Sequence, residues 1–570
     1  MSSTRERGCI SQKDGNKGKG KRQLLDSEAP SEKNYSGRLG KKNDRTRKGI
    51  TMSARARAVK AREEVLAPTS KNDREKTHME DFTIPNYVDN DSDDNISEEE
   101  DMLFSDILFQ REREDDEDLV DDNGDDTDDV EGDDIGEEDE EEQNVHKIDD
   151  WQLIRGIDGG PSNPELLTGF RAHVAHYIWI GQDRGLLTCH NRSDQLSSWT
   201  IEQDDVKLLL AKTQLKHLSA CMFEHVNLPL ISAFVERWHP ETNSFHMPFG
   251  EMTITLHDVS YILNVPVVGN PLITENTGPA VSLMKTHMAS LLYMSMDEIN
   301  KNWKKGTIKF NVVKSNVSNQ NVNPKHTAIG FLLWLVGATL FVDKTHNAVN
   351  GHFLPFLMNL EGVSSYAWGA ATLAYMYRQL GKASRFQTKQ ISGCLTLLQA
   401  WIYEYFPRFR PTENGNWAKQ PPYAARWVPG KMKKTNDDLL IYRAALDCMT
   451  VDEVTWTPFT RDPSKDVPIL RYCGIIHCRS ITEPYMPIRV LRQFGYVQVI
   501  PPCPFVPNKV YRGSNIHKYN CVHDPMITNW RTWQQHLMQP GMLGSFRARF
   551  TTEVADNYIN WFKDRTHAKV

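Results

Sequence analysis

The stretch from residue 231 to residue 270, ISAFVERWHPETNSFHMPFGEMTITLHDVSYILNVPVVGN, carries the local signals that decide the fold. Its first part predicts a helix over residues 230–238, because apolar residues repeat there at helical spacing, at Leu230, Phe234, Val235 and Trp238. Pro240 should close this helix, since the residue before a proline avoids the helical conformation. A turn is expected to follow.

The second part of the stretch predicts a short strand and a second helix. The run Met252–Thr255 (MTIT) is rich in residues that favour strands. Thr255 and Asp258 have the spacing of a capping box, in which two side chains satisfy free N–H groups at a helix start. We therefore predict that Thr255 caps a helix running to about Leu263. Nothing in this pattern specifies a reaction.

Three segments of this region resemble the signature of a known family. They are 236–242 (ERWHPET), 245–259 (FHMPFGEMTITLHDV) and 263–269 (LNVPVVG). The run is similar to the plant mobile domain, a family also called aminotransferase-like, which includes the MAINTENANCE OF MERISTEMS group. Two positions depart from the expected pattern: His239 stands where arginine is expected, and Asn264 where glycine is usual.

Later segments are similar to further blocks of the family, in the same order. They are 341–345, 366–380, 395–404, 490–498 and 558–562, and the resemblance covers about residues 160–566. It implies a mainly α fold: one helical globular domain over 151–570 with a few short β-strands. The motif residues that it singles out, and that we interpret as structural, are Arg237, Trp238, Pro240, Glu241, Gly250, Glu251, Asp258, Trp368, Gly369, Arg378, Arg492 and Phe494.

Charge divides the 570-residue chain into three parts, although the net charge is only −8. Residues 1–75 hold 20 Lys and Arg against 10 Asp and Glu, residues 76–150 hold 4 against 34, and residues 151–570 hold 43 against 31. The first two parts lack hydrophobic periodicity and cannot bury enough apolar surface to offset the entropy of ordering. We therefore predict a disordered basic arm over 1–75 and a disordered acidic segment over 76–150.

Two basic clusters in the arm are candidates for nuclear import. The first is 17–22 (KGKGKR), and the second contains Lys41, Lys42, Arg45, Arg47 and Lys48. Exposed clusters of this kind also attract phosphates, or simply keep the arm solvated. On the first interpretation the protein is expected in the nucleus.

The acidic segment contains one apolar interruption. Between Glu112 and Glu142, 21 of 31 residues are acidic. Such a block can bind a basic partner such as a histone tail, fold back over the basic arm, or act only as a solubilising spacer. Just before this block, 102–109 (MLFSDILF) places Leu103, Phe104, Ile107 and Leu108 on one side of a potential helix. Such a segment can fold into a groove, or it is a chance apolar cluster.

Within the globular part, a helix is predicted at 201–223 from apolar periodicity. Three more are predicted from their length and the scarcity of helix breakers, at 327–342, 367–380 and 391–406. Residues 311–323, rich in Asn and Ser, are predicted to form an exposed loop. The longest apolar run has 12 residues, fewer than the roughly 20 that span a bilayer, so no membrane association is expected. The polar start and the nine scattered cysteines suit a soluble protein in a reducing compartment.

No enzyme motif emerges from the residues. A pyridoxal phosphate enzyme needs a Schiff-base lysine, an acidic partner for the pyridinium nitrogen and a phosphate cup, and no lysine here sits in such a setting. We predict no cofactor, no metal and no catalytic residues. His239, Glu241, His246 and Glu251 are the nearest to acid–base groups or ligands, but hydrogen bonding within the turn explains them more simply. Arg237 and Glu251 flank this turn, and we expect them to pair across it.

Cysteine and histidine pairs give only a weak metal signal. Cys473, His477 and Cys478 lie close together, with Cys503, Cys521 and His523 downstream. Zinc sites favour tightly spaced ligand pairs, and the first pair lies in the apolar run 469–481, so buried structural cysteines are predicted instead.

Nucleic-acid binding stays open as an alternative. Residues 255–265 resemble the first helix and turn of a helix-turn-helix, but Pro266, Gly269 and Pro271 leave no room for a recognition helix. The segment 423–427 (YAARW) can stack on bases or pack internally.

From the sequence we predict a non-enzymatic nuclear interaction protein. What the resemblance implies is a plant factor of transposon-related origin, acting in transposable-element silencing, genome integrity and meristem maintenance. The expected partners are nuclear proteins, which can include a phosphatase-like protein or chromatin. The alternatives are a transposon-encoded nucleic-acid-binding protein and a degenerate enzyme.

Overall fold

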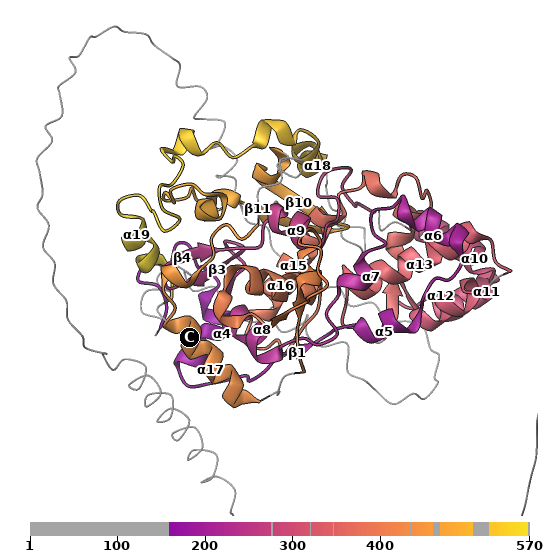
Figure 1. The fold of residues 1–570 in the computed structure, drawn as a ribbon, viewed down its shortest axis with the longest axis horizontal. Helices are drawn as coiled ribbons and strands as arrows, with labels where there is room; N and C mark the ends of the chain where they lie inside the picture. The colour runs from indigo at the N-terminus through magenta and orange to yellow at the C-terminus, as the bar shows by residue number, and fades with distance from the viewer. Residues whose placement is uncertain are drawn as a thin grey trace, which may run out of the picture. The chain divides into compact units, whose positions relative to one another are not determined.

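The computed structural model confirms a mainly α-helical fold with short strands (Figure 1). The predictions for the basic arm, the acidic segment, the import candidates and 102–109 lie outside the described residues. The residues that the structure describes are 159–274, 278–319, 321–345, 347–431, 435–459, 468–504, 524–567 and 570. In these ranges no helix is both long and apolar enough to cross a membrane.

The α-helices are short to medium in length. They are α4 (Val174–Trp179), α5 (Ser193–Ser198), α6 (Asp204–Ala211), α7 (Leu218–Cys221), α8 (Leu228–Val235), α9 (Leu256–Ile262), α10 (Gly278–Leu292), α11 (Met296–Asn302), α12 (Phe310–Val317), α13 (Pro324–Thr339), α14 (Leu354–Leu357), α15 (Trp368–Ala383), α16 (Leu395–Tyr405), α17 (Asn436–Asp447), α18 (Asp524–Arg531) and α19 (Tyr558–Arg565).

The strands form small sheets of two or three strands. They are β1 (Thr188–Cys189), β2 (Trp238–His239), β3 (Ser244–Met247), β4 (Gly250–Met252), β5 (Thr307–Lys309), β6 (Ala348–Asn350), β7 (Gln390–Ile391), β8 (Thr412–Glu413), β9 (Trp427–Val428), β10 (Gly474–Cys478) and β11 (Ile481–Tyr485). The order β2-β3-β4 is an antiparallel meander, β10-β11 is a hairpin, and β1 pairs with β7 in parallel.

Helix α13 is the centre of one group of helices, in which α5, α6, α10 and α12 contact it (Figure 1). Helix α14 contacts it as well. Asn323 caps its start by accepting a hydrogen bond from the Lys325 N–H, and Pro324 occupies the first turn, where a missing N–H costs nothing. A Cβ at Gly330 would lie 2.6 Å from the Val317 side chain. The glycine therefore lets α12 approach α13 closely.

The predicted loop at 311–323 is wrong over most of its length, because α12 occupies 310–317. Its buried residues are Phe310, Val313 and Val317, an i, i+3, i+7 stripe that faces α13. The packing of this stripe outweighs the low helix propensity of the asparagine and serine residues between its members.

Helix α15 is the centre of a second group. It lies beside the β10-β11 hairpin and α9 (Figure 1), and it also contacts β7 and β2. Twelve of its residues are buried. The prediction of a helix over 367–380 is confirmed. The prediction at 391–406 is too long at its start, because Gly393 has a φ of 98° and α16 begins only at Leu395.

The central stretch folds as α8, the β2-β3-β4 meander and α9. The capping box is confirmed: Thr255 and Asp258 bond reciprocally at the start of α9. The first helix ends earlier than predicted, at Val235, so Trp238 begins strand β2 and pairs with Phe245 instead of ending a helical face. The predicted single helix at 201–223 is also wrong, because the chain turns between α6 and α7, where Gln214 has a φ of 59°.

Candidate functional site

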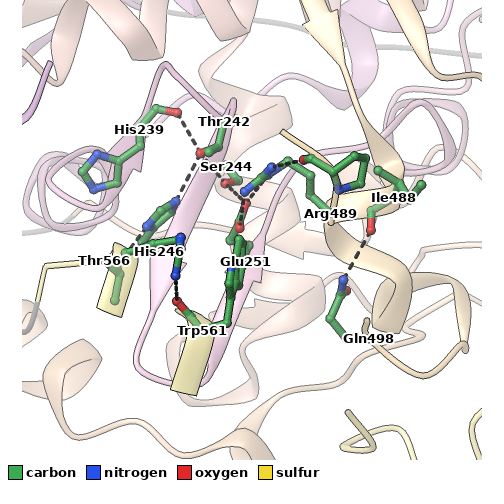
Figure 2. A network of polar contacts seen from close by, with 12 residues as sticks. His239, Thr242, Ser244, His246, Glu251, Ile488, Arg489, Gln498, Trp561 and Thr566 are labelled. Atoms are coloured by element: carbon green, nitrogen blue, oxygen red, sulfur yellow. Dashed lines mark hydrogen bonds and ion pairs between the residues drawn. The ribbon is translucent and has the colours of Figure 1, made fainter. Parts of the chain in front are cut away.

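The β2-β3-β4 meander carries a buried ion pair. Glu251 on β4 faces Arg489 through two bonds, Oε2 to Nε at 2.7 Å and Oε1 to Nη2 at 2.7 Å, and both side chains are buried (Figure 2). Ser244 donates a third hydrogen bond to Oε2 at 2.7 Å. The expected pairing of Glu251 with Arg237 across the turn is therefore wrong.

A chain of hydrogen bonds continues from the carboxylate towards the C-terminal helix. The Ser244 hydroxyl also lies 2.8 Å from Thr242 Oγ1, which lies 3.1 Å from His246 Nε2. His246 Nδ1 lies 2.9 Å from Thr566 Oγ1, as Figure 2 shows. The residues that Glu251 connects thus come from the meander, from the segment around residue 489 and from the end of α19.

The Glu251 carboxylate is held in its ionised form, and both of its oxygens already accept hydrogen bonds. Burial alone would raise the pKa of Glu251, but the Arg489 guanidinium and the Ser244 hydroxyl hold that pKa below its usual value. A carboxylate with a lowered pKa, whose oxygens already accept three hydrogen bonds, is poorly suited to accept a proton from a substrate. The arrangement instead fixes β4 against the segment that contains Arg489.

Two further buried arginines form ion pairs beside the meander. Arg237 pairs with Asp447 at the end of α17, and its Nη1 donates to the His246 carbonyl oxygen at 3.3 Å. Arg443 of α17 binds Glu236 through two bonds of 2.6 and 2.7 Å, and it also binds Asp183. Helix α17 is thereby attached to the end of α8.

Four histidines gather next to this network: His173, His239, His246 and His567. His246 pairs with Glu251 in the β3-β4 register, and His239 pairs with Ser244 in the β2-β3 register. The ring of His239 lies 4.3 Å from that of His173, 4.4 Å from that of His246 and 5.1 Å from that of His567, measured between centroids. Burial lowers the pKa of His173 to about 3 and that of His246 to about 4, so both are neutral at physiological pH.

These histidines do not form a ligand set for a metal. His173 Nε2 bonds to the Trp238 carbonyl oxygen and Nδ1 accepts from the Ala175 N–H, while His246 uses both nitrogens on threonines. Across the described ranges no group of three or more His, Cys, Asp or Glu residues is arranged to hold an ion. The rings pack on one another and on Phe170.

Asp258 belongs to a buried hydrogen-bond network. Its Oδ2 accepts from the N–H and hydroxyl of Thr255 at 2.6 and 2.7 Å, and its Oδ1 accepts from the Tyr405 hydroxyl at 2.8 Å. Burial raises the pKa of Asp258 to about 7, against these hydrogen bonds. The residue caps α9 and ties it to α16, as a structural role requires.

Arg492 is packed among aromatic rings. Its guanidinium lies 4.0 Å from the Trp456 ring centroid and donates to the Phe249 carbonyl oxygen at 2.8 Å. Gly250, with a φ of 129°, lies directly against it, because a Cβ there would be 2.4 Å from the guanidinium. Both residues are thus parts of one close contact.

The partners of the motif residues come from distant parts of the sequence. Arg489, Asp447 and Arg443 were not predicted, although they complete the buried charges of the motif. Arg489 is separated from Glu251 by 238 positions and Asp447 from Arg237 by 210. No spacing rule connects residues so far apart, and burial of a charge signals only that some partner exists.

Comparison with known proteins identifies this motif. A family model described as plant mobile domain matches residues 216–563. The chain belongs to the plant mobile domain family. It is 34% identical over 366 residues to Protein MAIN-LIKE 1 of Arabidopsis thaliana, a match that covers 60% of this chain and 69% of that protein. No solved structure matches it.

Two other relatives widen the comparison. Protein MAINTENANCE OF MERISTEMS of Arabidopsis thaliana is 34% identical over 341 residues, which cover 58% of this chain and 70% of that protein. The Serine/threonine-protein phosphatase 7 long form homolog of the same plant is 30% identical over 378 residues, which cover 61% of this chain but only 27% of that protein. The similarity to the phosphatase homolog therefore spans about a quarter of its length.

Other motif residues of the plant mobile domain also contact neighbouring elements. Trp368 is buried and donates from its indole N–H to the Val363 carbonyl oxygen at 2.8 Å. The Gly369 N–H donates to the Pro266 carbonyl oxygen at 2.7 Å, and a Cβ at Gly369 would crowd that chain. Arg378 pairs with Glu483 of β11 at 2.5 Å.

The remaining motif residues lie nearer the surface. Glu241 Oε1 accepts from the Gly169 N–H at 2.7 Å, and burial raises its pKa. Pro240 is exposed in the turn between β2 and β3, and Phe494 is half-buried. Phe494 is one wall of a cavity that is described below.

The cysteine and arginine–aromatic candidates serve packing within this domain. Cys478 on β10 is buried and Cys473 half-buried, while Cys503 is exposed; Cys521 and His523 lie outside the described residues. The Arg426 guanidinium lies 4.4 Å from the Trp427 ring centroid and pairs with Glu404 at 3.1 Å. Trp427 is buried, so it is not placed to stack on a base.

Proposed function

We propose that this plant mobile domain protein is a non-enzymatic interaction protein of the nucleus that acts with its relatives' class of plant factors in meristem maintenance. The observation that carries the proposal is the Glu251–Arg489 pair, since this carboxylate of the family motif is buried and bonded within the fold. Such a buried motif stabilises the elements around it, whose outer surface is available to partners, instead of forming a reactive centre.

The relatives' names support a role in meristems. Proteins named MAIN-LIKE 1 and MAINTENANCE OF MERISTEMS match over more than two thirds of their own length. Silencing of transposable elements and protection of genome integrity are the finer parts of this proposal, and they rest on the resemblance to factors of transposon-related origin. A phosphatase-like protein is a partner worth testing, because a protein named as a phosphatase homolog contains a segment similar to this chain.

Nuclear localisation is tested with the full-length chain carrying a fluorescent tag in plant cells. Alanine at Lys41, Lys42, Arg45, Arg47 and Lys48 should reduce nuclear accumulation, since exposed lysine and arginine clusters are what import receptors bind. The matched control replaces five basic residues of the globular part. An unchanged nuclear signal, with the cluster at 17–22 also removed, would contradict the proposal.

The molecular role is tested by what the purified full-length chain binds. Capture of a phosphatase-like protein or of histones from plant nuclei supports an interaction protein if the complex persists at about 0.3 M salt, which is roughly twice the physiological ionic strength. Binding to duplex or single-stranded DNA that weakens steeply with salt would favour the nucleic-acid-binding alternative, because phosphate contacts release counterions. An absorbance band from a co-purifying cofactor would favour the enzyme alternative.

A further inference from the structure

A cavity of about 370 Å³ opens beside the C-terminal end of the family motif. Its walls include the aromatic residues Tyr261, Phe459, Phe494 and Tyr496. Two arginines, Arg471 and Arg547, also line it, and among its described lining residues there is no carboxylate. Aromatic walls with arginines are suited to a ligand that is both apolar and acidic.

Arg547 is held in place at this cavity. Its Nη1 donates to the Phe494 carbonyl oxygen at 2.8 Å, and its guanidinium lies 4.1 Å from the Tyr496 ring centroid. A guanidinium has five N–H donors, so this bond leaves capacity for a carboxylate ligand. Fixing the side chain beforehand reduces the entropy that binding would otherwise lose.

The segment that carries Arg547 also exposes large apolar side chains close to Arg547 in the sequence. Phe546 is 69% exposed, Phe550 is 72% exposed and Met542 is more exposed still. The backbone is nevertheless fixed, because the Val497 N–H donates to the Phe546 carbonyl oxygen at 3.0 Å. Exposed apolar side chains on a fixed backbone are typical of an interaction site. We call Met542, Phe546, Arg547 and Phe550, with the cavity, the aromatic–arginine face.

We propose that residues 102–109 of the same chain (MLFSDILF) bind this aromatic–arginine face and cover it. The segment has apolar residues at helical spacing. Asp106 lies within the segment, and Asp101 directly precedes it. Its apolar side chains would contact the exposed phenylalanines and enter the cavity, while its carboxylates would pair with Arg471 and Arg547. Helix-in-groove recognition uses this arrangement of anchors.

The net charges of the two parts of the chain also favour binding of residues 102–109 to the aromatic–arginine face. The part of the chain that contains the segment, 76–150, has 4 basic and 34 acidic residues, whereas 151–570 has 43 basic and 31 acidic residues. Opposite net charges within one chain raise the rate at which the segment meets the face and orient the encounter.

The connection is long enough and keeps the segment close. About 50 residues separate Phe109 from the first described residue, which corresponds to a root-mean-square span of at least about 40 Å, because like charges extend a linker. Such a tether gives an effective concentration on the order of a few mM. A segment that binds as a free peptide with a Kd of about 100 µM would then occupy its own chain more than about nine-tenths of the time.

The test uses the full-length chain and a fluorescein-labelled synthetic peptide of residues 98–110. In one variant, Leu103, Phe104, Ile107 and Leu108 are replaced by serine, which removes the competing internal segment. The peptide should bind this variant at least about 10-fold more tightly than it binds the unmodified chain, as measured by fluorescence anisotropy. The serine variant with Phe546→Ser and Phe550→Ser should lose this binding.

Matched controls separate the face from general effects on the protein. Leu208→Ser and Ile441→Ser, at residues 67% and 64% exposed on α6 and α17, should leave peptide binding unchanged. Arg547→Ala should weaken binding several-fold and lessen its salt dependence, because one charged contact is lost. Arg171→Ala, also at an exposed position, should do neither.

Four results would overturn the proposal. Failure of the peptide to bind the serine variant, or binding that survives Phe546→Ser with Phe550→Ser, would exclude this face. Equal affinity for the unmodified chain and the serine variant would mean that the face receives a motif from another protein. If the unmodified chain binds the peptide more weakly as the protein concentration rises, a second copy of the chain supplies the segment.

Discussion

Replacing Glu251 by glutamine should destabilise the domain strongly without changing its shape. Glu251 and Arg489 are both buried and are joined by two bonds of 2.7 Å, and Ser244 adds a third bond. The amide keeps the volume of the side chain but leaves the arginine charge buried without a counter-charge. Removing one partner of such a pair costs about 3–5 kcal/mol.

The loss of stability expected for Glu251→Gln can be compared with the loss expected from a change at an exposed ion pair in the same chain. Glu413 pairs with Arg426 at 2.5 Å, but the Glu413 side chain is 57% exposed. Glu413→Gln should therefore cost no more than about 1 kcal/mol. For a folded unit of about 400 residues, 3–5 kcal/mol lowers Tm by roughly 4–6 °C, whereas the exposed change lowers it by about 1 °C or less.

The assay is thermal and urea unfolding of the full-length chain, followed by tryptophan fluorescence. A double variant, Glu251→Gln with Arg489→Gln, should recover part of the loss, because it no longer buries an unpaired charge. If Glu251→Gln melts like the unmodified chain and yet no longer binds a partner, the structural interpretation is refuted. The residue would then belong to a functional surface.

Three more changes follow from the same contacts. Trp238→Ala should cost about 3–5 kcal/mol in urea unfolding because the indole is fully buried, whereas Trp179→Ala, at an exposed residue, should cost less than about 1 kcal/mol; equal losses would contradict this. Gly250→Ala should lower Tm, since a side chain at a φ of 129° would meet a guanidinium 2.4 Å away, and an unchanged melting curve would count against that crowding. His173 and His246 have folded pKa values of about 3 and about 4, below the ordinary 6.5, so the stability that their neutral rings contribute is complete above pH 6.5 and is lost as pH falls towards 4. Because Asp258, whose pKa is raised to about 7, changes stability in the opposite direction, the unmodified chain is compared with His173→Gln: it should lose free energy of unfolding relative to that variant between pH 7 and pH 4.5, and a constant difference would refute this.

The sequence by itself determined the features that depend on neighbouring residues. The capping box at Thr255 and Asp258 was predicted correctly, because its four positions are adjacent in the chain and its hydrogen bonds form within one turn. The helix at 367–380 was predicted for the same kind of reason, since a long run with few helix breakers is a local property of the chain. The family was likewise identified from contiguous motifs, which the match over 216–563 confirms.

Only the tertiary structure decided which charges pair and where marginal elements form. Glu251 was expected to pair with Arg237 in the same turn, but its partner is Arg489, while Arg237 pairs with Asp447. Such choices depend on which segments the fold brings together, and the low dielectric of the interior makes each buried charge require a partner wherever one is available. Residues 310–317 became a helix for a similar reason: the surface of α13 stabilises their apolar stripe, and no residue of the segment itself encodes that surface.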